Sequence, residues 1–295
     1  MSATAPARYW QLRTRRLTLG RLPLLMGIVN VTPDSFSDGG EFLDPDQAVR
    51  QGLSLVAQGA DLLDIGGEST RPYATPVSVG EELRRVGPVI RALRRATDVP
   101  ISVDTSKAAV ARAALDEGAE IINDVTGLEG DPRMLDVVRR AEPGVCVMHM
   151  LGTPATMQDH PDYSDVVQEV TQYLRRRRDE LVACGVAPAR ICLDPGIGFG
   201  KSTTHNLALL THVARLRALG CPVLIGHSRK GFIGRVLADN QTDRTAGTIG
   251  VALAVALQGA AILRVHDVQP VRQALELFSA CGALGAMDET GTSPV

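Results

Sequence analysis

Five polar residues in this 295-residue chain follow short apolar runs, and their types suit the binding of a planar, nitrogen-rich ring. They are Asp64, Asp104, Asn123, Asp194 and Lys230. A carboxylate accepts two parallel hydrogen bonds from an amidine-like edge, in the way that it pairs with a guanidinium. The ammonium of Lys230 adds a donor. The set therefore indicates recognition of a flat heterocycle through charge-assisted hydrogen bonds.

A second group of polar residues suits an anion. Arg264 and His266 are two residues apart on one predicted strand, so their side chains point to the same face. Asn30 ends the first predicted strand, which lies beside the last one if the sheet closes into a barrel. We expect these three side chains to bind a phosphorylated group, either alone or together with a metal ion.

The elements that must position these residues are eight apolar runs that alternate with segments of helical periodicity. Continuous apolar runs are typical of parallel strands that are covered on both faces. The predicted strands are 24–29, 62–65, 101–103, 120–123, 145–148, 191–193, 223–225 and 261–265, and the predicted helices are 45–58, 79–97, 106–117, 132–140, 164–184, 203–218, 244–257 and 268–281. This α/β pattern predicts a (β/α)8 TIM barrel. A doubly wound open sheet is the alternative, but Asn30-Val31-Thr32-Pro33 stands where its glycine-rich turn would be.

The chain is expected to form one domain with two short additions. Residues 1–20 are predicted to be an N-terminal extension, which can form a hairpin under the barrel. Residues 21–282 are predicted to form the barrel itself. Residues 283–295 are small and polar, and they are predicted to form a flexible tail.

The active site of a TIM barrel lies at the C-terminal ends of its strands. Polar residues occur at all eight predicted ends: Asn30, Asp64, Asp104, Asn123-Asp124, His149, Asp194, His227 to Lys230, and Arg264 to Asp267. Asp104 alone could cap the helix that follows it. Capping does not account for eight polar ends, so the pattern predicts a functional site there.

Two further motifs have simpler interpretations. The segment 196–202 (GIGFGKS) has neither P-loop nor dinucleotide-turn spacing, so we interpret it as a flexible loop whose exposed Phe199 closes over a substrate. His149 is interpreted as a core histidine bonded to backbone, and the arginines of 175–178 as a solvated helix face.

The sequence contains neither H-E-x-x-H nor a Cys/His cluster, so no structural metal site is expected.

Composition excludes several classes of function. The net charge is −2 and aromatic residues make up 3%, so neither a basic nor a stacking surface for nucleic acid is expected. Residues 245–263 carry no charge, but Gln258-Gly259 divides them, which favours a buried helix and strand over a membrane span. The N-terminus lacks the apolar core of a signal peptide. The five cysteines form no C-x-x-C pair and are interpreted as buried residues in a reducing compartment, so we expect a cytoplasmic protein.

Seven strings, in order along the chain, resemble those of the dihydropteroate synthases, folate-pathway enzymes of the pterin-binding family. They are 26–40 (MGIVNVTPDSFSDGG), 64–72 (DIGGESTRP), 102–105 (SVDT), 122–125 (INDV), 193–201 (LDPGIGFGK), 228–230 (SRK) and 264–268 (RVHDV). The likeness extends from about Leu22 to Leu277. One departure is Tyr73, where the family usually has glycine.

The resemblance implies a transferase reaction of folate biosynthesis. In it, (7,8-dihydropterin-6-yl)methyl diphosphate condenses with p-aminobenzoate to give 7,8-dihydropteroate and diphosphate. It also implies a Mg²⁺ cofactor, a dissociative course, sulfonamide binding, small-molecule substrates and a homodimer built through the later helices. Some relatives are non-catalytic pterin-binding paralogues, and others are methyltetrahydrofolate-corrinoid methyltransferases, so both remain alternatives. The strings expected to be lost or absent in those proteins are intact here.

The resemblance also implies roles for individual residues. The implied pterin ligands are Asp104, Asn123, Asp194 and Lys230, and the implied p-aminobenzoate pocket comprises Phe36, Thr70, Arg71, Pro72, Phe199, Ser228 and Lys230. The diphosphate is implied to bind Asn30, Arg71, Arg264 and His266, with Asn30 also a metal ligand. Asp104, Asp194, Lys230, Arg264 and His266 are the implied catalytic residues. The loops 31–42 and 66–77 are expected to close over the substrates.

Overall fold

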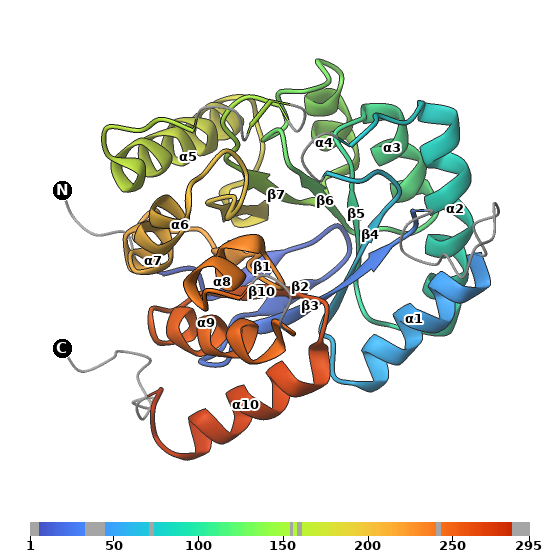
Figure 1. Cartoon of the computed structure of the whole chain (residues 1–295). Helices are drawn as coiled ribbons and strands as arrows, with labels where there is room; N and C mark the ends of the chain where they lie inside the picture. Colours follow the sequence, from blue (N-terminus) through green and yellow to red (C-terminus); the bar gives the residue numbers. More distant parts are fainter. Residues whose placement is uncertain are drawn as a thin grey trace.

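Eight parallel strands form a ring in the computed structural model, which describes residues 6–32, 45–70, 74–153, 156–157, 161–239 and 243–284 (Figure 1). The strand order is β8-β7-β6-β5-β4-β3-β10-β9. A parallel bridge between Leu193 and Val223 joins β8 to β9 and closes the ring. The strands are β3 (Leu24–Asn30), β4 (Leu62–Gly66), β5 (Ile101–Asp104), β6 (Ile121–Asp124), β7 (Gly144–Met148), β8 (Ile191–Asp194), β9 (Leu224–Ile225) and β10 (Ile262–Val265). The predicted TIM barrel is thus confirmed, and the open sheet is excluded.

Helices cover the outside of the ring in the described part of the chain (Figure 1). They are α1 (Pro45–Ala57), α2 (Val79–Ala96), α3 (Ala108–Asp116), α4 (Met134–Ala141), α5 (Val166–Ala183), α6 (Thr203–Leu210), α7 (Val213–Arg217), α8 (Gly231–Val236), α9 (Thr245–Leu257) and α10 (Val268–Ala280), with a 3-10 turn at Pro188–Arg190. Their apolar faces pack on the outward-facing strand residues, and together these form the largest core cluster. None of the helices described here is long and apolar enough to cross a membrane.

A hairpin of β1 (Tyr9–Gln11) and β2 (Arg16–Thr18) closes the N-terminal end of the ring, as expected. Trp10 is fully buried there, and its indole Nε1 donates to the carbonyl of Arg190 over 2.8 Å. It packs in one cluster with the first inward-facing layer of the barrel, which comprises Met26, Leu62, Ile121, Cys146, Cys192, Leu224 and Ile262. The bottom of the barrel is therefore apolar and plugged.

Side chains in a strand alternate between faces, so the next inward-facing residue lies two positions further along. From the apolar layer, that step leads to Asp64 on β4, Asn123 on β6, Asp194 on β8 and Arg264 on β10. The strands are so short that this second layer lies within two residues of their C-terminal ends. The alternation of side chains along each strand thus places these polar groups together, in the layer directly above the apolar one.

The structure corrects four local predictions. The helix expected over 203–218 is two helices, because Oγ1 of Thr211 and Nδ1 of His212 bind carbonyls at the end of α6. Helix α8 was not expected. Cys184 and Cys281 are exposed, although the other cysteines are buried. Arg177 and Arg178, expected to be solvated, donate to the carbonyls of Gly127 and Leu219 and so fasten loops.

Candidate active site

A cavity of about 760 Å³ opens at the C-terminal ends of the strands. Its lining includes side chains from both groups identified in the sequence and from the loop after β4. Among the lining residues are Asn30, Glu68, Thr70, Asp104, Phe199, Lys201, Ser228, Lys230, Arg264 and His266. The predicted residues Phe36, Arg71 and Pro72, and the departure Tyr73, lie outside the described residues.

Asp64, Asn123 and Asp194 are not among the residues that line the cavity, but Asp64 holds Asn123 and the lining residue Arg264. We call the network that these bonds form the floor of the site. Oδ2 of Asp64 accepts a hydrogen bond from Nδ2 of Asn123 at 2.9 Å and another from Nε of Arg264 at 2.6 Å. The Nη2 atom of Arg264 donates in turn to Oδ2 of Asp104 at 2.8 Å. Asp64 is fully buried and Asn123 is 5% exposed, so these bonds are shielded from water.

Arg264 therefore lies among the carboxylates, in contact with the expected pterin side of the site. The sequence predicted Arg264 to be an anion ligand and a catalytic residue, and it did not predict the bonds to Asp64 and Asp104. Burial alone would lower the pKa of Arg264, but Asp64 and Asp104 raise it above its ordinary value. Burial raises the pKa of Asp104, Arg264 opposes that rise, and the neighbouring Asp64 adds to it. Asp104 binds Arg264, and Oγ1 of Thr105 accepts from the amide of Lys107 at the start of α3, so Asp104 does not act as the helix cap.

Asp194 is held at the end of β8 by the turn that follows it. Its Oδ1 accepts from the amide of Gly196 at 2.7 Å. Gly196 has a φ of +68°, and a Cβ there would lie 1.9 Å from the carbonyl oxygen of His149, so only glycine fits. Burial raises the pKa of Asp194 to about 6, although this bond, Lys230 and Lys201 all lower it. The carboxylate is thus fixed and ionised at neutral pH.

Lys230 and Phe199 form the wall of the cavity beside Asp194. The Nζ atom of Lys230 lies 4.1 Å from the centre of the Phe199 ring, a cation–π contact. Burial lowers the pKa of Lys230 to about 8, with Arg264 contributing, so it is mostly protonated at pH 7. Phe199 is 9% exposed and packs with Val125, Met148 and Met157. The prediction of an exposed Phe199 was therefore wrong, because these apolar side chains cover the ring.

Lys201 is a site residue to which sequence reasoning gave no role. It is 1% exposed, and its Nζ contacts Nδ1 of His149 at 3.0 Å and the carbonyl of Phe199 at 2.9 Å. Burial lowers the pKa of Lys201 to about 7. The pKa of His149 is lowered to about 3, mainly by its own burial and also by the nearby charge of Lys201. His149 is in the core with a backbone hydrogen bond, as expected, but its ring also contacts Lys201. A lysine within a glycine-rich loop was the only signal.

Of the expected anion residues, Asn30 ends β3, Arg264 is on β10 and His266 follows β10. His266 contacts Ser228, with Nδ1 and Oγ 3.0 Å apart, so the residue after β10 is tied to the segment after β9. His227, in contrast, is fully buried with Nε2 3.0 Å from the carbonyl of Thr248, which is a structural role. Asn30 lines the cavity at the end of β3.

A closed ring of eight parallel strands with a charged cavity at its C-terminal end defines an enzyme of the (β/α)8-barrel class. Residues 26–266 match the model of the family described as pterin binding enzyme. The chain belongs to that family.

Named relatives agree with this membership. The chain is 46% identical to the dihydropteroate synthase of Neisseria meningitidis serogroup B over 92% of its own length and 97% of that protein. It is 44% identical to the dihydropteroate synthase of Escherichia coli strain K12, over 88% and 91% of the two chains. The Xanthomonas albilineans dihydropteroate synthase solved with 4-aminobenzoic acid superposes with a TM-score of 0.87 at 48% identity, covering 94% of this chain and 99% of that one. The Burkholderia cenocepacia enzyme complexed with 7,8-dihydropteroate gives 0.85 at 45% identity, covering 95% and 98%.

Proposed function

We propose that this chain is a transferase that condenses (7,8-dihydropterin-6-yl)methyl diphosphate with p-aminobenzoate to give 7,8-dihydropteroate and diphosphate. The observation that carries the proposal is the network of Asp64, Asn123, Asp104 and Arg264 at the floor of the site. The named relatives, which match nearly the whole chain, are dihydropteroate synthases. Both substrates are small molecules that a cavity of about 760 Å³ can hold.

We propose that the pterin lies against the carboxylate floor. Because Nδ2 of Asn123 is bonded to Asp64, its Oδ1 is left as an acceptor for a ring N–H or amino group. Asp194 accepts from the amino-pyrimidine edge of the pterin. Lys230 donates to a ring acceptor while its Nζ stays over the face of the Phe199 ring. These groups together orient the methylene carbon toward the open part of the cavity.

The same residues favour breakage of the bond between that carbon and the diphosphate oxygen. The electron pair leaves with diphosphate, and positive charge spreads over the pterin ring. Asp104 and Asp194 stabilise that charge because both are fixed before the reaction, Asp104 by Arg264 and the buried Asp194 by the amide of Gly196. The amine nitrogen of p-aminobenzoate then forms the new bond to carbon and releases a proton. Substrate binding excludes water that would otherwise capture the cation.

We propose that His266, Ser228 and Asn30 bind the departing diphosphate. Arg264 lies between this diphosphate edge and the pterin side of the site. The contact between Ser228 and His266 supports this assignment because it groups two donors at one edge of the cavity. Arg71 is proposed as a further ligand. For p-aminobenzoate we propose a pocket formed by Thr70, Phe199, Ser228 and Lys230, together with Phe36, Arg71 and Pro72.

The donor set at the diphosphate edge fits Mg²⁺. This ion prefers oxygen ligands, keeps several waters, and commonly needs only one or two protein ligands besides substrate phosphates. The amide oxygen of Asn30 is such a ligand, and among the described residues no group of three or more His, Cys, Asp or Glu could hold a metal. When bound, Mg²⁺ would neutralise charge that develops on the diphosphate.

We further propose a homodimer through the later helices. Apolar side chains that are more than half exposed support it: Val236 and Leu237 at the end of α8, Leu257 on α9 and Leu277 on α10.

The odd number and the spacing of the cysteines support a cytoplasmic location. We propose residues 21–282 as the catalytic domain and 1–20 as an extension, whereas the predicted tail, 283–295, lies almost wholly outside the described residues.

Release of diphosphate by the purified protein tests the function. With the pterin diphosphate, p-aminobenzoate and Mg²⁺ present, we expect continuous release, and a much lower rate without the amine. A protein that binds a dihydropterin but releases no diphosphate would be a non-catalytic pterin-binding paralogue. Transfer of a methyl group from methyltetrahydrofolate to a corrinoid would identify a methyltransferase instead.

A further inference from the structure

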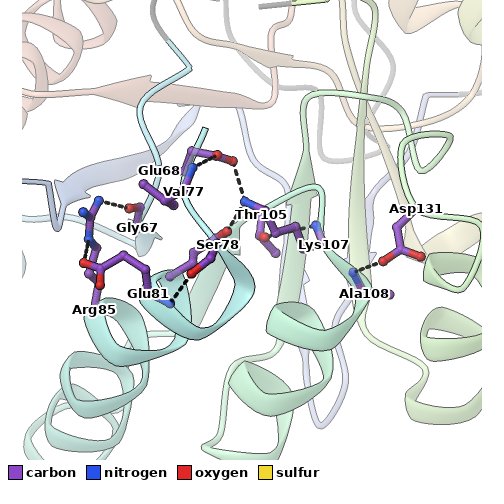
Figure 2. Close-up of polar contacts among 11 residues, drawn as sticks. Gly67, Glu68, Val77, Ser78, Glu81, Arg85, Thr105, Lys107, Ala108 and Asp131 are labelled. Carbon is purple, nitrogen blue, oxygen red and sulfur yellow. Dashed lines mark hydrogen bonds and ion pairs between the residues drawn. The ribbon is translucent and has the colours of Figure 1, made fainter. Parts of the chain in front are cut away.

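The loop after β4 is held by a side chain from its own base. Oε1 of Glu68 accepts from the amide of Val77 at 2.8 Å, which joins two points nine residues apart (Figure 2). Its other oxygen, Oε2, accepts from Nζ of Lys107 at 2.8 Å. Glu68 and Thr70 both line the cavity. Glu68 therefore links the start of this loop both to its far end and to the segment after β5.

Lys107 connects three elements of the barrel. Its Nζ donates to Glu68 and, at 2.5 Å, to Oε2 of Glu82 on α2. Glu82 is fully buried, whereas Glu68 and Lys107 are about one-fifth exposed. Burial alone would lower the pKa of Lys107, but its bonds to Glu68 and Glu82 raise it. Lys107 thus remains charged and neutralises a carboxylate that would be costly to bury alone.

A second contact fastens the same loop to α2. Nη1 of Arg85 donates to the carbonyl of Gly67 at 2.8 Å (Figure 2). Gly67 approaches the helix closely, since a Cβ there would lie 2.7 Å from Cγ1 of Val86. Backbone that precedes Thr70 is thereby held at a defined distance from α2. Asp104 is three residues before Lys107, so the segment that carries Lys107 begins in the pterin floor.

We propose that Glu68, Lys107 and Glu82 form a clasp that positions the loop bearing Thr70 for the second substrate, p-aminobenzoate. The inference rests on the proposed function and adds a positioning role to residues outside the reacting groups. Among the described residues, Nζ of Lys107 donates to Glu68 and Glu82 and not to the floor network, whereas the charge of Glu82 reaches the pterin side by raising the pKa of Asp104. We therefore expect the clasp to act chiefly on the second substrate and to affect the pterin site only through that charge.

Two variants and one control test the clasp. Glu68→Gln weakens the link to Lys107 and keeps the Lys107–Glu82 pair. Lys107→Met combined with Glu82→Gln removes the clasp without leaving a lone buried charge. The control is Glu117→Gln, which removes the charge that pairs with Arg91 and so weakens the link between α2 and the end of α3 at an exposed place.

We expect both clasp variants to raise the KM for p-aminobenzoate, by about tenfold or more in the double variant, because a displacement of about 1 Å has effects of this size. The Kd for a dihydropterin and the kcat should stay close to those of the parent. Peptides that cover residues 66–70 and 74–78 should exchange amide hydrogens faster than in the parent. Glu117→Gln should match the parent in all four measurements.

An active parent whose clasp variants keep its KM for p-aminobenzoate would overturn the proposal. An equal loss of pterin affinity would also overturn it, since that result indicates a general structural role. Unchanged amide exchange would show that the clasp does not hold the loop. A parent that makes no dihydropteroate, while exchange still quickens in the variants, would refute the synthase function and leave the tie between loop and helix standing.

Discussion

The carboxylate of Asp64 fixes the orientation of the Asn123 side chain. The Nδ2 atom of Asn123 donates to Oδ2 of Asp64 over 2.9 Å, although β5 lies between their strands. An amide that donates on one side presents its oxygen on the other. Asp64, which is fully buried and also accepts from Arg264, therefore determines what Asn123 offers to a ligand.

Asp64→Asn should weaken dihydropterin binding roughly tenfold or more. The substitution removes a charged acceptor from Arg264 and frees the Asn123 amide to turn, and hydrogen bonds to charged groups contribute about 1.5–3 kcal/mol. Calorimetric titration measures the affinity. Asp61→Asn is a matched control, because Asp61 binds the amide of Leu25 at the opposite end of the barrel. If the Asp64 variant bound dihydropterin as tightly as this control, Asp64 would have no part in recognition.

Much of the fold follows from the sequence, because parallel strands buried on both faces appear as apolar runs. The predicted strands were correct to within one or two residues. The start of α3 was less predictable, because the amide of Ala108 binds Oδ2 of Asp131, a distant residue, and no local cap marks the boundary. At the break between α6 and α7 the local contacts of Thr211 and His212 are supplemented by a distant one, because Gln258 binds the carbonyl of Leu210 and the amide of Val213. Distant partners of this kind leave no local pattern.

Membership of the candidate site was more predictable than its pairings. The polar strand ends placed Asp104, Lys230, Arg264 and His266 around one cavity, as expected. Sequence spacing could not show that Arg264 would bind Asp64 and Asp104, since β10 and β5 are far apart in the chain. It also could not show the burial of Phe199, which depends on packing from three other segments.

Dihydropterin affinity should fall as the pH drops through about 6. Burial raises the pKa of Asp194 from 3.8 to about 6, so the ionised acceptor is lost below that value. The same raised pKa affects folding stability in the opposite direction. Protonated Asp194 favours the folded state at pH below about 4, and this contribution is lost as the pH rises through about 6. Titrations from pH 5 to pH 8 should show a decline at the acidic end that Asp194→Asn makes shallower, and the part that remains belongs to Asp104, whose pKa burial raises to about 7. An equally steep decline in that variant would assign the titration to another group.

His266→Ala and Arg264→Ala should differ in effect. His266 contacts Ser228 at the diphosphate edge, so its loss should weaken diphosphate binding and leave dihydropterin affinity nearly unchanged. Loss of Arg264 leaves Asp64 and Asp104 without their cation, so it should weaken binding of both. Separate titrations with diphosphate plus Mg²⁺ and with a dihydropterin distinguish the two variants. Parent-like diphosphate binding by His266→Ala would move the anion site elsewhere.

Trp10→Ala should lower the free energy of unfolding by about 3–5 kcal/mol, the usual cost of truncating a buried tryptophan. Trp10 is fully buried at the bottom of the barrel, far from the cavity, so the KM values should not change. Urea denaturation measures the loss, and Tyr9→Ala, at an exposed neighbour, should change stability little. Equal stability of the two variants would mean that the hairpin does not hold the barrel closed.

The most direct measurement of the central claim is identification of the product by mass spectrometry. The purified protein, given the pterin diphosphate, p-aminobenzoate and Mg²⁺, should form 7,8-dihydropteroate in amounts that match the diphosphate released. Asp194→Ala, which lacks the acceptor at the end of β8 and whose folding circular dichroism would check, should form at least about tenfold less. Diphosphate release without dihydropteroate, or equal product from the variant, would contradict the account of how this cavity works.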